Sequence, residues 1–293
     1  MKMVMEREDK ELFMNITANQ CPGCPENLAA KLSMQIVFET LGEDQPIVYG
    51  QGCGIGRDFL QRSGLGTHDS GCAAMKTAMA IRGIDRPLVV IDGDGQVDMG
   101  LDDLASAFQQ GYQYMHIVCD NQGHSASGSH ATGSTDVLAR VSSRPTGRIQ
   151  GRIQGRKHFT FMLMFSGANY VATASPSHFR DLERKIKEGL KRLPAFIQIM
   201  TPCNPSWGYD DDKGVTVAKL AVTTGLWPLY EWKDGVFRRT ISVPRRTPVE
   251  EYTRLQRRYA HLSREDFGAI NGYIDEMDDL VNRMERAFGP DLD

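Results

Sequence analysis

The stretch that decides the fold runs from residue 87 to residue 121 and reads PLVVIDGDGQVDMGLDDLASAFQQGYQYMHIVCDN. It begins with a short apolar run at 87–92, continues through a polar, glycine-rich turn and a helical pattern at 101–111, and ends with a second apolar run at 114–119. Short apolar runs of this kind are typical of buried parallel strands. Strand, helix and strand in succession predict parallel pairing with a right-handed crossover.

The same alternation continues on both sides of this stretch. We expect helices at 26–42, 70–83 and 177–191, and strands at 46–50, 169–174 and 194–201. The pattern predicts an α/β fold with an open, mostly parallel sheet and flanking helices. In such folds the loops at the carboxyl ends of the strands carry the chemistry.

The chain divides by composition into two predicted parts. Residues 1–203 form the α/β domain, and residues 204–293 are polar and charge-rich. The second part contains a strand pair around Lys233-Asp234-Gly235 and helices at 248–260 and 264–287. We interpret it as a C-terminal extension and partner-facing arm.

Composition excludes several classes of protein. The chain has 293 residues, 41% of them hydrophobic, and a formal net charge of -3, which gives no general basic signal for nucleic acid. The charged N-terminal residues do not read as a signal peptide, and no run of about 18 apolar residues predicts a membrane span. We therefore expect a cytoplasmic protein that binds neither nucleic acid nor membrane.

Polar residues follow both central strands directly. Asp94 lies between Gly93 and Gly95, and Asn121 follows the next strand. The ends of adjacent parallel strands bring their loops together, so a carboxylate and an amide oxygen can share one Mg²⁺, a cation that prefers oxygen ligands and substrate phosphates. The glycines allow close approach of a diphosphate, and a helix expected to start near Gly100 would direct amide groups at it. The alternative is an ordinary turn.

Six cysteines are distributed unevenly along the chain. Four lie in turns beside glycine or proline, namely Cys21, Cys24, Cys53 and Cys203. Four thiolates can hold a [4Fe–4S] cluster or a zinc ion, but structural zinc normally uses two close pairs and only one pair is close here, which favours the cluster. In the alternative, Cys53 and Cys203 are incidental and the Cys-x-x-Cys acts alone. We interpret Cys72 and Cys119 as buried structural thiols.

A short tandem repeat, GRIQGRIQGRK, occupies residues 147–157. Its basic residues are Arg148, Arg152, Arg156 and Lys157. One interpretation is a solvated loop, and the other is a basic loop near an anionic ligand or partner.

Together these motifs resemble the β subunit of the 2-oxoacid:ferredoxin oxidoreductases, typified by pyruvate:ferredoxin oxidoreductase. Twenty-five residues separate Gly95 from Asn121, a spacing similar to the thiamine diphosphate fingerprint. The resemblance covers roughly residues 18–235. Its pieces are CPGC at 21–24, GCG at 52–54, IDGDGQVDMG at 91–100, DNQGHSASG at 120–128, YVATAS at 170–175, TPC at 201–203 and TGLWPLYEW at 224–232.

The resemblance implies the ligands of two inorganic groups. The cluster ligands would be Cys21, Cys24, Cys53 and Cys203. Asp94 and Asn121 would bind Mg²⁺ by their side chains and Gly123 by its carbonyl. Further cofactor-binding residues would be Gly52, His68, Gly93, Gly95, His124 and Ser125; for His124 a solvated loop histidine is the alternative.

The resemblance also implies the reaction and the partners. A 2-oxoacid would be oxidatively decarboxylated on thiamine diphosphate, with coenzyme A as the acyl acceptor, and electrons would pass singly through the cluster to ferredoxin. An α-type chain would supply the glutamate that activates the cofactor, and a ferredoxin-like chain would complete the complex, so this chain alone should be inactive.

One departure concerns the substrate. Family members often carry Asn-Thr-Gly after the magnesium loop, whereas this chain has Ala126-Ser127-Gly128, with His130 nearby. Pyruvate is the default substrate, and oxalate or an aromatic 2-oxoacid such as phenylglyoxylate are alternatives. Two other classes stay open: a non-redox thiamine diphosphate decarboxylase or transferase subunit, and a zinc-stabilised assembly module without catalytic activity.

Overall fold

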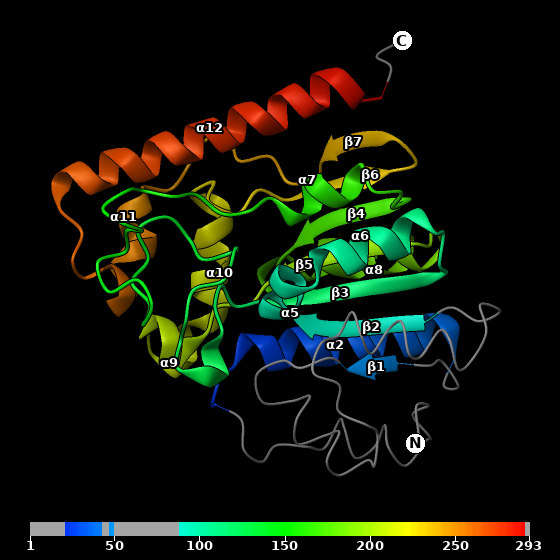
Figure 1. The fold of residues 1–293 in the computed structure, drawn as a ribbon, viewed down its shortest axis with the longest axis horizontal. Helices are drawn as coiled ribbons and strands as arrows, with labels where there is room; N and C mark the ends of the chain where they lie inside the picture. Colours follow the sequence, from blue (N-terminus) through cyan, green and yellow to red (C-terminus); the bar gives the residue numbers. More distant parts are fainter. Residues whose placement is uncertain (1–20, 43–46, 50–87, 291–293) are drawn as a thin grey trace.

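The computed structural model describes residues 21–42, 47–49 and 88–290. Their centre is a seven-stranded sheet in the order β1-β2-β3-β5-β4-β6-β7 (Figure 1). The strands are β1 (Ile47–Tyr49), β2 (Leu88–Gly93), β3 (Tyr114–Asp120), β4 (Tyr170–Ala174), β5 (Ala195–Met200), β6 (Tyr230–Lys233) and β7 (Val236–Arg239). Strands β1 to β5 are parallel to one another. Strand β6 is antiparallel to β4, and β7 is antiparallel to β6.

Helices cover both faces of the sheet. The described helices are α2 (Pro25–Leu41), α5 (Asp94–Met99), α6 (Leu101–Gln109), α7 (Phe159–Met164), α8 (Phe179–Leu190), α9 (Asn204–Trp207), α10 (Gly214–Thr223), α11 (Val249–Thr253) and α12 (Arg264–Phe288), of which α9, α10 and α11 pack in a cluster of their own. Successive residues of a strand point to opposite faces. On β2, Val89 and Ile91 pack with α2 and α8, whereas Val90 packs with α6, α7 and α12. Every residue of β2, β3, β4 and β5 is buried, as expected for a sheet covered on both faces.

The described elements confirm most of the predicted ones. The strands expected at 46–50, 87–92, 114–119, 169–174 and 194–201 and the helices expected at 26–42, 101–111, 177–191 and 264–287 form within a few residues of these bounds. The segment after β2 differs, because α5 begins directly at Asp94 where we expected a turn. The helix expected at 248–260 is divided into α11 and a short 3-10 turn, and the helix expected at 70–83 lies outside the described residues.

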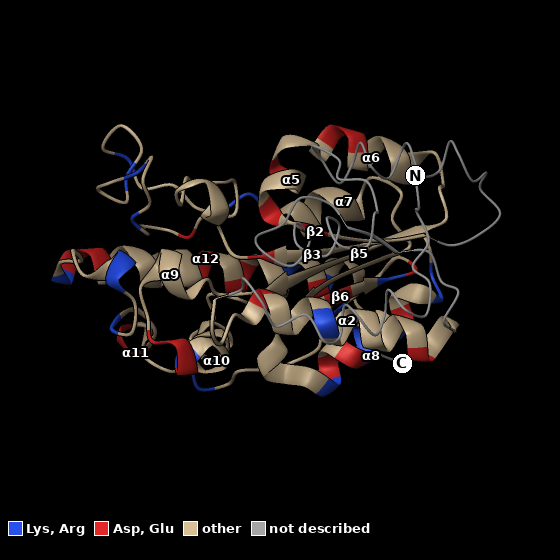
Figure 2. Cartoon of the chain, turned by 90° about the horizontal axis from the view of Figure 1, so that it is seen from below, with Lys and Arg blue, Asp and Glu red and all other residues tan. Residues whose placement is uncertain are grey.

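Residues 204–290 pack against the α/β core. The β6–β7 hairpin forms around Asp234 and Gly235, both with positive φ, and extends the sheet beyond β4. Helix α12 begins with a capping box between Ser263 and Asp266 and runs along the outside of the molecule past β7 (Figure 1). Acidic and basic residues are interspersed along α8 and α12 (Figure 2). None of the described helices is both long enough and apolar enough to cross a membrane.

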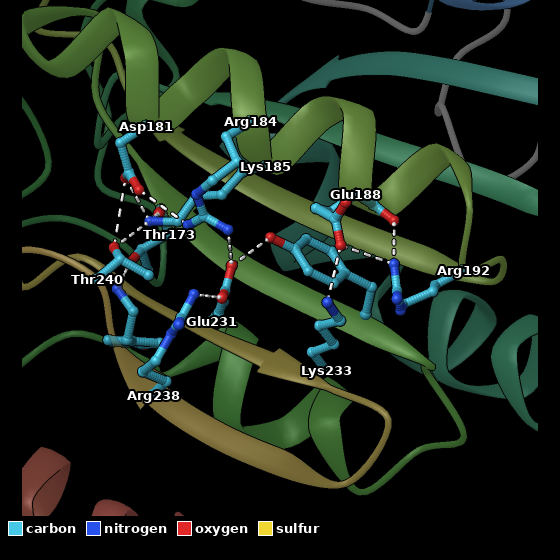
Figure 3. Close-up of polar contacts among 12 residues, drawn as sticks. Thr173, Asp181, Arg184, Lys185, Glu188, Arg192, Glu231, Lys233, Arg238 and Thr240 are labelled. Atoms are coloured by element: carbon cyan, nitrogen blue, oxygen red, sulfur yellow. Dashed lines mark hydrogen bonds and ion pairs between the residues drawn. The ribbon is translucent and has the colours of Figure 1, made fainter. Parts of the chain in front are cut away.

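A polar network fastens α8 to the hairpin (Figure 3). The Lys185 ammonium is fully buried and donates to the Thr173 carbonyl, the Asp181 carboxylate and the Thr240 hydroxyl at 2.6–2.8 Å. All three of its protons are therefore used. The buried Glu231 carboxylate on β6 accepts further hydrogen bonds from Tyr170, Arg184 and Arg238. Because each buried charge has several partners, the network can hold the hairpin against α8 without leaving a charge unpaired.

Candidate cofactor and metal site

The carboxyl ends of β2, β3 and β5 meet at one edge of the sheet. Gly93 pairs with Cys119, and Asp120 pairs with Met200. The Thr201 amide donates a hydrogen bond of 2.8 Å to the Asp120 carbonyl, which continues the alignment beyond the strand. The loops that begin at Asp94, Asn121 and Thr201 therefore start side by side.

Asp94 is a buried carboxylate with one unpaired oxygen. Its Oδ2 accepts from the Thr132 hydroxyl at 2.5 Å and from the Ser134 hydroxyl at 2.8 Å. Its Oδ1 is buried and makes no hydrogen bond with the described residues. Burial raises the pKa of Asp94 well above its usual value, and the Asp120 carboxylate raises it further. A buried oxygen of this kind beside other carboxylates fits a bound divalent cation.

Asn121 is held from three directions. Its Nδ2 donates to Glu26 Oε2, its Oδ1 accepts from the Ser125 hydroxyl, and its carbonyl accepts from the indole nitrogen of Trp207, each at 2.9 Å. The side chain is buried together with Glu26, near the N-terminus of α2. Asn121 therefore has a fixed orientation, and its amide oxygen lies at the same edge as Asp94.

The conformation of the loop after Asn121 depends on close packing of its side chains. Gln122 has a φ of 62°, and Arg258 Nη1 donates to its side-chain oxygen at 2.9 Å. At Gly95, an added Cβ would lie 2.5 Å from His124 Nδ1. The glycine is therefore required for the imidazole to pack here, and His124 lies against the predicted magnesium loop.

Asn204 joins the two cysteine loops. Its Nδ2 donates to the Pro22 carbonyl at 3.0 Å and to Asp211 Oδ1 at 2.5 Å, so the residue after Cys203 binds inside the Cys21–Cys24 turn. The close approach of the two loops is also seen at Gly23, where an added Cβ would overlap the Asp211 carbonyl.

The described cysteines are free thiols in different environments. Cys21 is exposed, Cys24 is half-buried, and Cys203 is buried. Burial raises the pKa of Cys24 to about 12, with further contributions from Glu26 and Cys203, and burial also raises the pKa of Cys203. Within the described ranges no group of three or more His, Cys, Asp or Glu side chains has an arrangement that could hold a metal ion. Cys119 is buried in β3, as predicted.

The structure brings together part of the predicted site. Asp94, Asn121, Gly123, His124 and Ser125 lie at one edge, with Gly93 and Gly95 in the same turn, and Cys24 and Cys203 adjoin them. Four expected residues lie outside the described residues, namely Gly52, Cys53, His68 and Cys72.

Sequence reasoning missed four residues of this site. Thr132 and Ser134 bind Asp94, Glu26 binds Asn121, and Asn204 fastens the Cys21–Cys24 turn. The one sequence signal available was the position of Glu26, two residues after the Cys-x-x-Cys motif. The others lie in loops far along the chain from their partners, so no spacing rule indicates them.

The basic loop at 147–157 contacts the rest of the chain more than a solvated loop would. Arg148 pairs with Asp266 of α12 at 2.5 Å, and Lys157 pairs with Asp98. The Arg156 side chain is only 7% exposed and lies over the ring of Trp227. Arg152 is exposed.

The chain is similar to several known proteins. Residues 50–199 match the model of the thiamine pyrophosphate enzyme, C-terminal TPP binding domain. The chain is 38% identical to the pyruvate synthase subunit PorB of Methanocaldococcus jannaschii over 64% of each chain. It is 31% identical to the PorB subunit of Methanothermobacter marburgensis over 92% of this chain and 96% of that one.

A solved structure shares the fold. The 2-oxoglutarate:ferredoxin oxidoreductase from Magnetococcus marinus, with 2-oxoglutarate, coenzyme A and succinyl-CoA bound, matches with a TM-score of 0.55. The match covers 67% of this chain and 68% of that chain, at 18% identity.

Fold and site therefore define a thiamine diphosphate-binding enzyme domain. The chain belongs to the family of β subunits of the 2-oxoacid:ferredoxin oxidoreductases, as its motifs predicted. It is one subunit of an oxidoreductase complex.

Proposed function

We propose that this chain binds the diphosphate end of thiamine diphosphate through Mg²⁺, and that it holds a [4Fe–4S] cluster beside it. Asp94, Asn121 and the Gly123 carbonyl would bind the cation. Cys21, Cys24, Cys53 and Cys203 would bind the cluster. The observation that carries the proposal is the buried, unpaired Oδ1 of Asp94 at the edge of the sheet where Asn121 lies. Three further buried or half-buried oxygens there, from Asp120, Glu26 and Ser125, add negative potential that favours a cation.

The reaction we propose is the oxidative decarboxylation of a 2-oxoacid, with pyruvate as the first candidate and coenzyme A as the acyl acceptor. Support comes from the relatives named pyruvate synthase subunits and from the coenzyme A in the Magnetococcus structure. When bound, the cofactor supplies the electron sink for decarboxylation and the cluster supplies a one-electron exit.

The residues of this chain would orient the cofactor. Thr132 and Ser134 occupy Asp94 Oδ2, which leaves Oδ1 for the cation. Glu26 and Ser125 fix the amide of Asn121. Gly95 admits the His124 imidazole to the same loop, where it can contact the cofactor or substrate. An α-type chain would supply the activating glutamate, and a ferredoxin-like chain and ferredoxin would accept the electrons.

The test is an anaerobic purification of the native complex, followed by iron, sulfide and thiamine diphosphate analysis and an assay of low-potential acceptor reduction. We expect pyruvate to support turnover among a panel that includes oxalate and phenylglyoxylate. A complex that contains thiamine diphosphate but no iron would contradict the cluster and favour a non-redox enzyme. Zinc without thiamine diphosphate would contradict the catalytic role.

A further inference from the structure

A small cavity lies on the sheet face covered by α12, and Lys157 in its lining pairs with Asp98 of α5. It is partly open, with a volume of about 30 Å³, and is lined by side chains of the 156–160 segment, by Gln198 of β5 and by Trp227. Among the described residues that line it, Arg156 and Lys157 are cationic and none is acidic. The charge of this lining favours an anionic occupant.

Arg156 is the buried charged group of this cavity. Its Nη2 donates to the Leu226 carbonyl, and its Nε donates to the Tyr273 hydroxyl at 3.4 Å. Its Nη1 is buried and makes no hydrogen bond with the described residues. Asp136 Oδ1 lies 3.9 Å from Nε, close enough for an ion pair but beyond hydrogen-bonding distance.

The other polar groups of the cavity are already paired or neutral. Lys157 is bound to Asp98, and the Thr160 hydroxyl is 2.6 Å from the Tyr230 hydroxyl. Burial and the nearby Arg156 lower the pKa of His158 to about 4, so its imidazole is neutral near pH 7 and can donate one hydrogen bond. An occupant would therefore meet Arg156 as the buried cationic donor, His158 as a neutral donor and the half-exposed Lys157 ammonium, which keeps two further protons.

We propose that the Arg156 cavity binds the carboxylate group of a small organic acid. A guanidinium nitrogen with a free proton is well matched to a carboxylate oxygen, and such charge-assisted hydrogen bonds are stronger than neutral ones. A water molecule needs about 10–15 Å³ of such volume, so the cavity has room for about two oxygen-sized atoms. A carboxylate can place both of its oxygens in this volume, whereas two of the four oxygens of orthophosphate would have to lie outside it. The rest of the acid would extend through the open side.

The site uses none of the residues proposed to bind the cofactor or the cluster. Arg156 does not contact Asp94, Asn121 or the cysteines in any hydrogen bond or ion pair of the described chain. It interacts electrostatically with Asp120, whose Oδ2 accepts from Gln198 at 2.6 Å. A carboxylate here would be coupled to the cofactor edge through Asp120, which shares the Ser134 hydroxyl with Asp94.

Saturation-transfer NMR of acetate and formate with the purified holoenzyme complex tests the proposal, at constant ionic strength and pH 7.5. We expect a saturable methyl signal from acetate whose apparent affinity falls about tenfold or more in Arg156→Gln, because one charge-assisted hydrogen bond is lost. Arg156→Lys keeps the buried charge but loses the planar fork, and should weaken binding less. Arg152→Gln changes an exposed arginine of the same loop and should leave binding unchanged.

Three outcomes would overturn the proposal. They are equal acetate binding by the Arg156→Gln and parent complexes, no saturable signal in either, and displacement of acetate by orthophosphate at equal concentration. Thiamine diphosphate content is measured in the same samples. Loss of acetate binding with unchanged thiamine diphosphate content supports the anion site whether or not the proposed 2-oxoacid reaction is correct.

Discussion

Asn121 donates a hydrogen bond of 2.9 Å from Nδ2 to Oε2 of Glu26, although the two residues are 95 positions apart in the chain. Glu26 is two residues beyond Cys24, and Asn121 also accepts from Ser125, whose hydroxyl interacts with Cys203. Asn121, a proposed magnesium ligand, is thus linked to the proposed cluster ligand Cys203 through Ser125. A change on one side should be measurable on the other.

Glu26→Ala should weaken magnesium-dependent binding of thiamine diphosphate. Asn121 would lose a buried partner, and its amide could rotate away from the cation. A hydrogen bond to a charged group contributes about 1.5–3 kcal/mol, so we expect the dissociation constant to rise about tenfold or more. Isothermal titration of the reconstituted complex with thiamine diphosphate measures this. Glu39→Ala, at an exposed position on α2, is the control, and an equal effect of both changes would contradict the positioning role.

Asp94→Asn should have opposite effects on binding and on stability. The change removes a buried charge while keeping an oxygen that can accept from Thr132. Without the cofactor, the variant should therefore be more stable to urea by about 1 kcal/mol or more, since an uncompensated buried charge is costly. Magnesium-dependent binding should be lost. Asp102→Asn, at an exposed position on α6, should change neither property. A variant that still binds thiamine diphosphate with magnesium would rule out Asp94 as a ligand.

Asn204→Ala should loosen the Cys21–Cys24 turn without removing a cysteine. Its side-chain amide donates the hydrogen bond that links the segment after Cys203 to the Pro22 carbonyl. We expect faster loss of iron to a chelator under anaerobic conditions, with little change in secondary structure. Asn169→Ala removes a comparable amide-to-carbonyl bond, to Leu193, at an exposed position far from the cysteines in the fold. If both variants release iron at the parental rate, the role assigned to Asn204 is wrong.

The sequence predicted those parts of the fold and of the site that follow from local residue patterns. The apolar runs that became β2 and β3 and the polar residues directly after them placed Asp94 and Asn121 at one edge, because adjacent parallel strands end together. Local pattern could not predict the Asn204–Pro22 bond or the approach of Thr132 to Asp94, which depend on how loops fold back over the sheet. It also missed α5, since Gly93 and Gly95 favour a turn by propensity, whereas tertiary packing selects a helix from Asp94.

Lys185 of α8 should make stability depend on alkaline pH (Figure 3). Burial lowers the pKa of Lys185 to about 8 from its ordinary value of 10.5, although Asp181 opposes the shift. The unfolded chain therefore binds more protons than the folded chain between pH 8 and 10.5, and this group's contribution to stability rises with pH in that window. Lys185→Met should abolish that rise. Below pH 8 it should lower the free energy of unfolding by about 1–3 kcal/mol, since Asp181 and the Thr240 hydroxyl each lose a buried partner.

Urea unfolding at several pH values measures both effects of the Lys185 change. Lys187→Met, whose ion pair with Glu183 is partly exposed on the same helix, should leave stability nearly unchanged and keep the parental pH dependence. If the pH dependence survives in Lys185→Met, another group causes it.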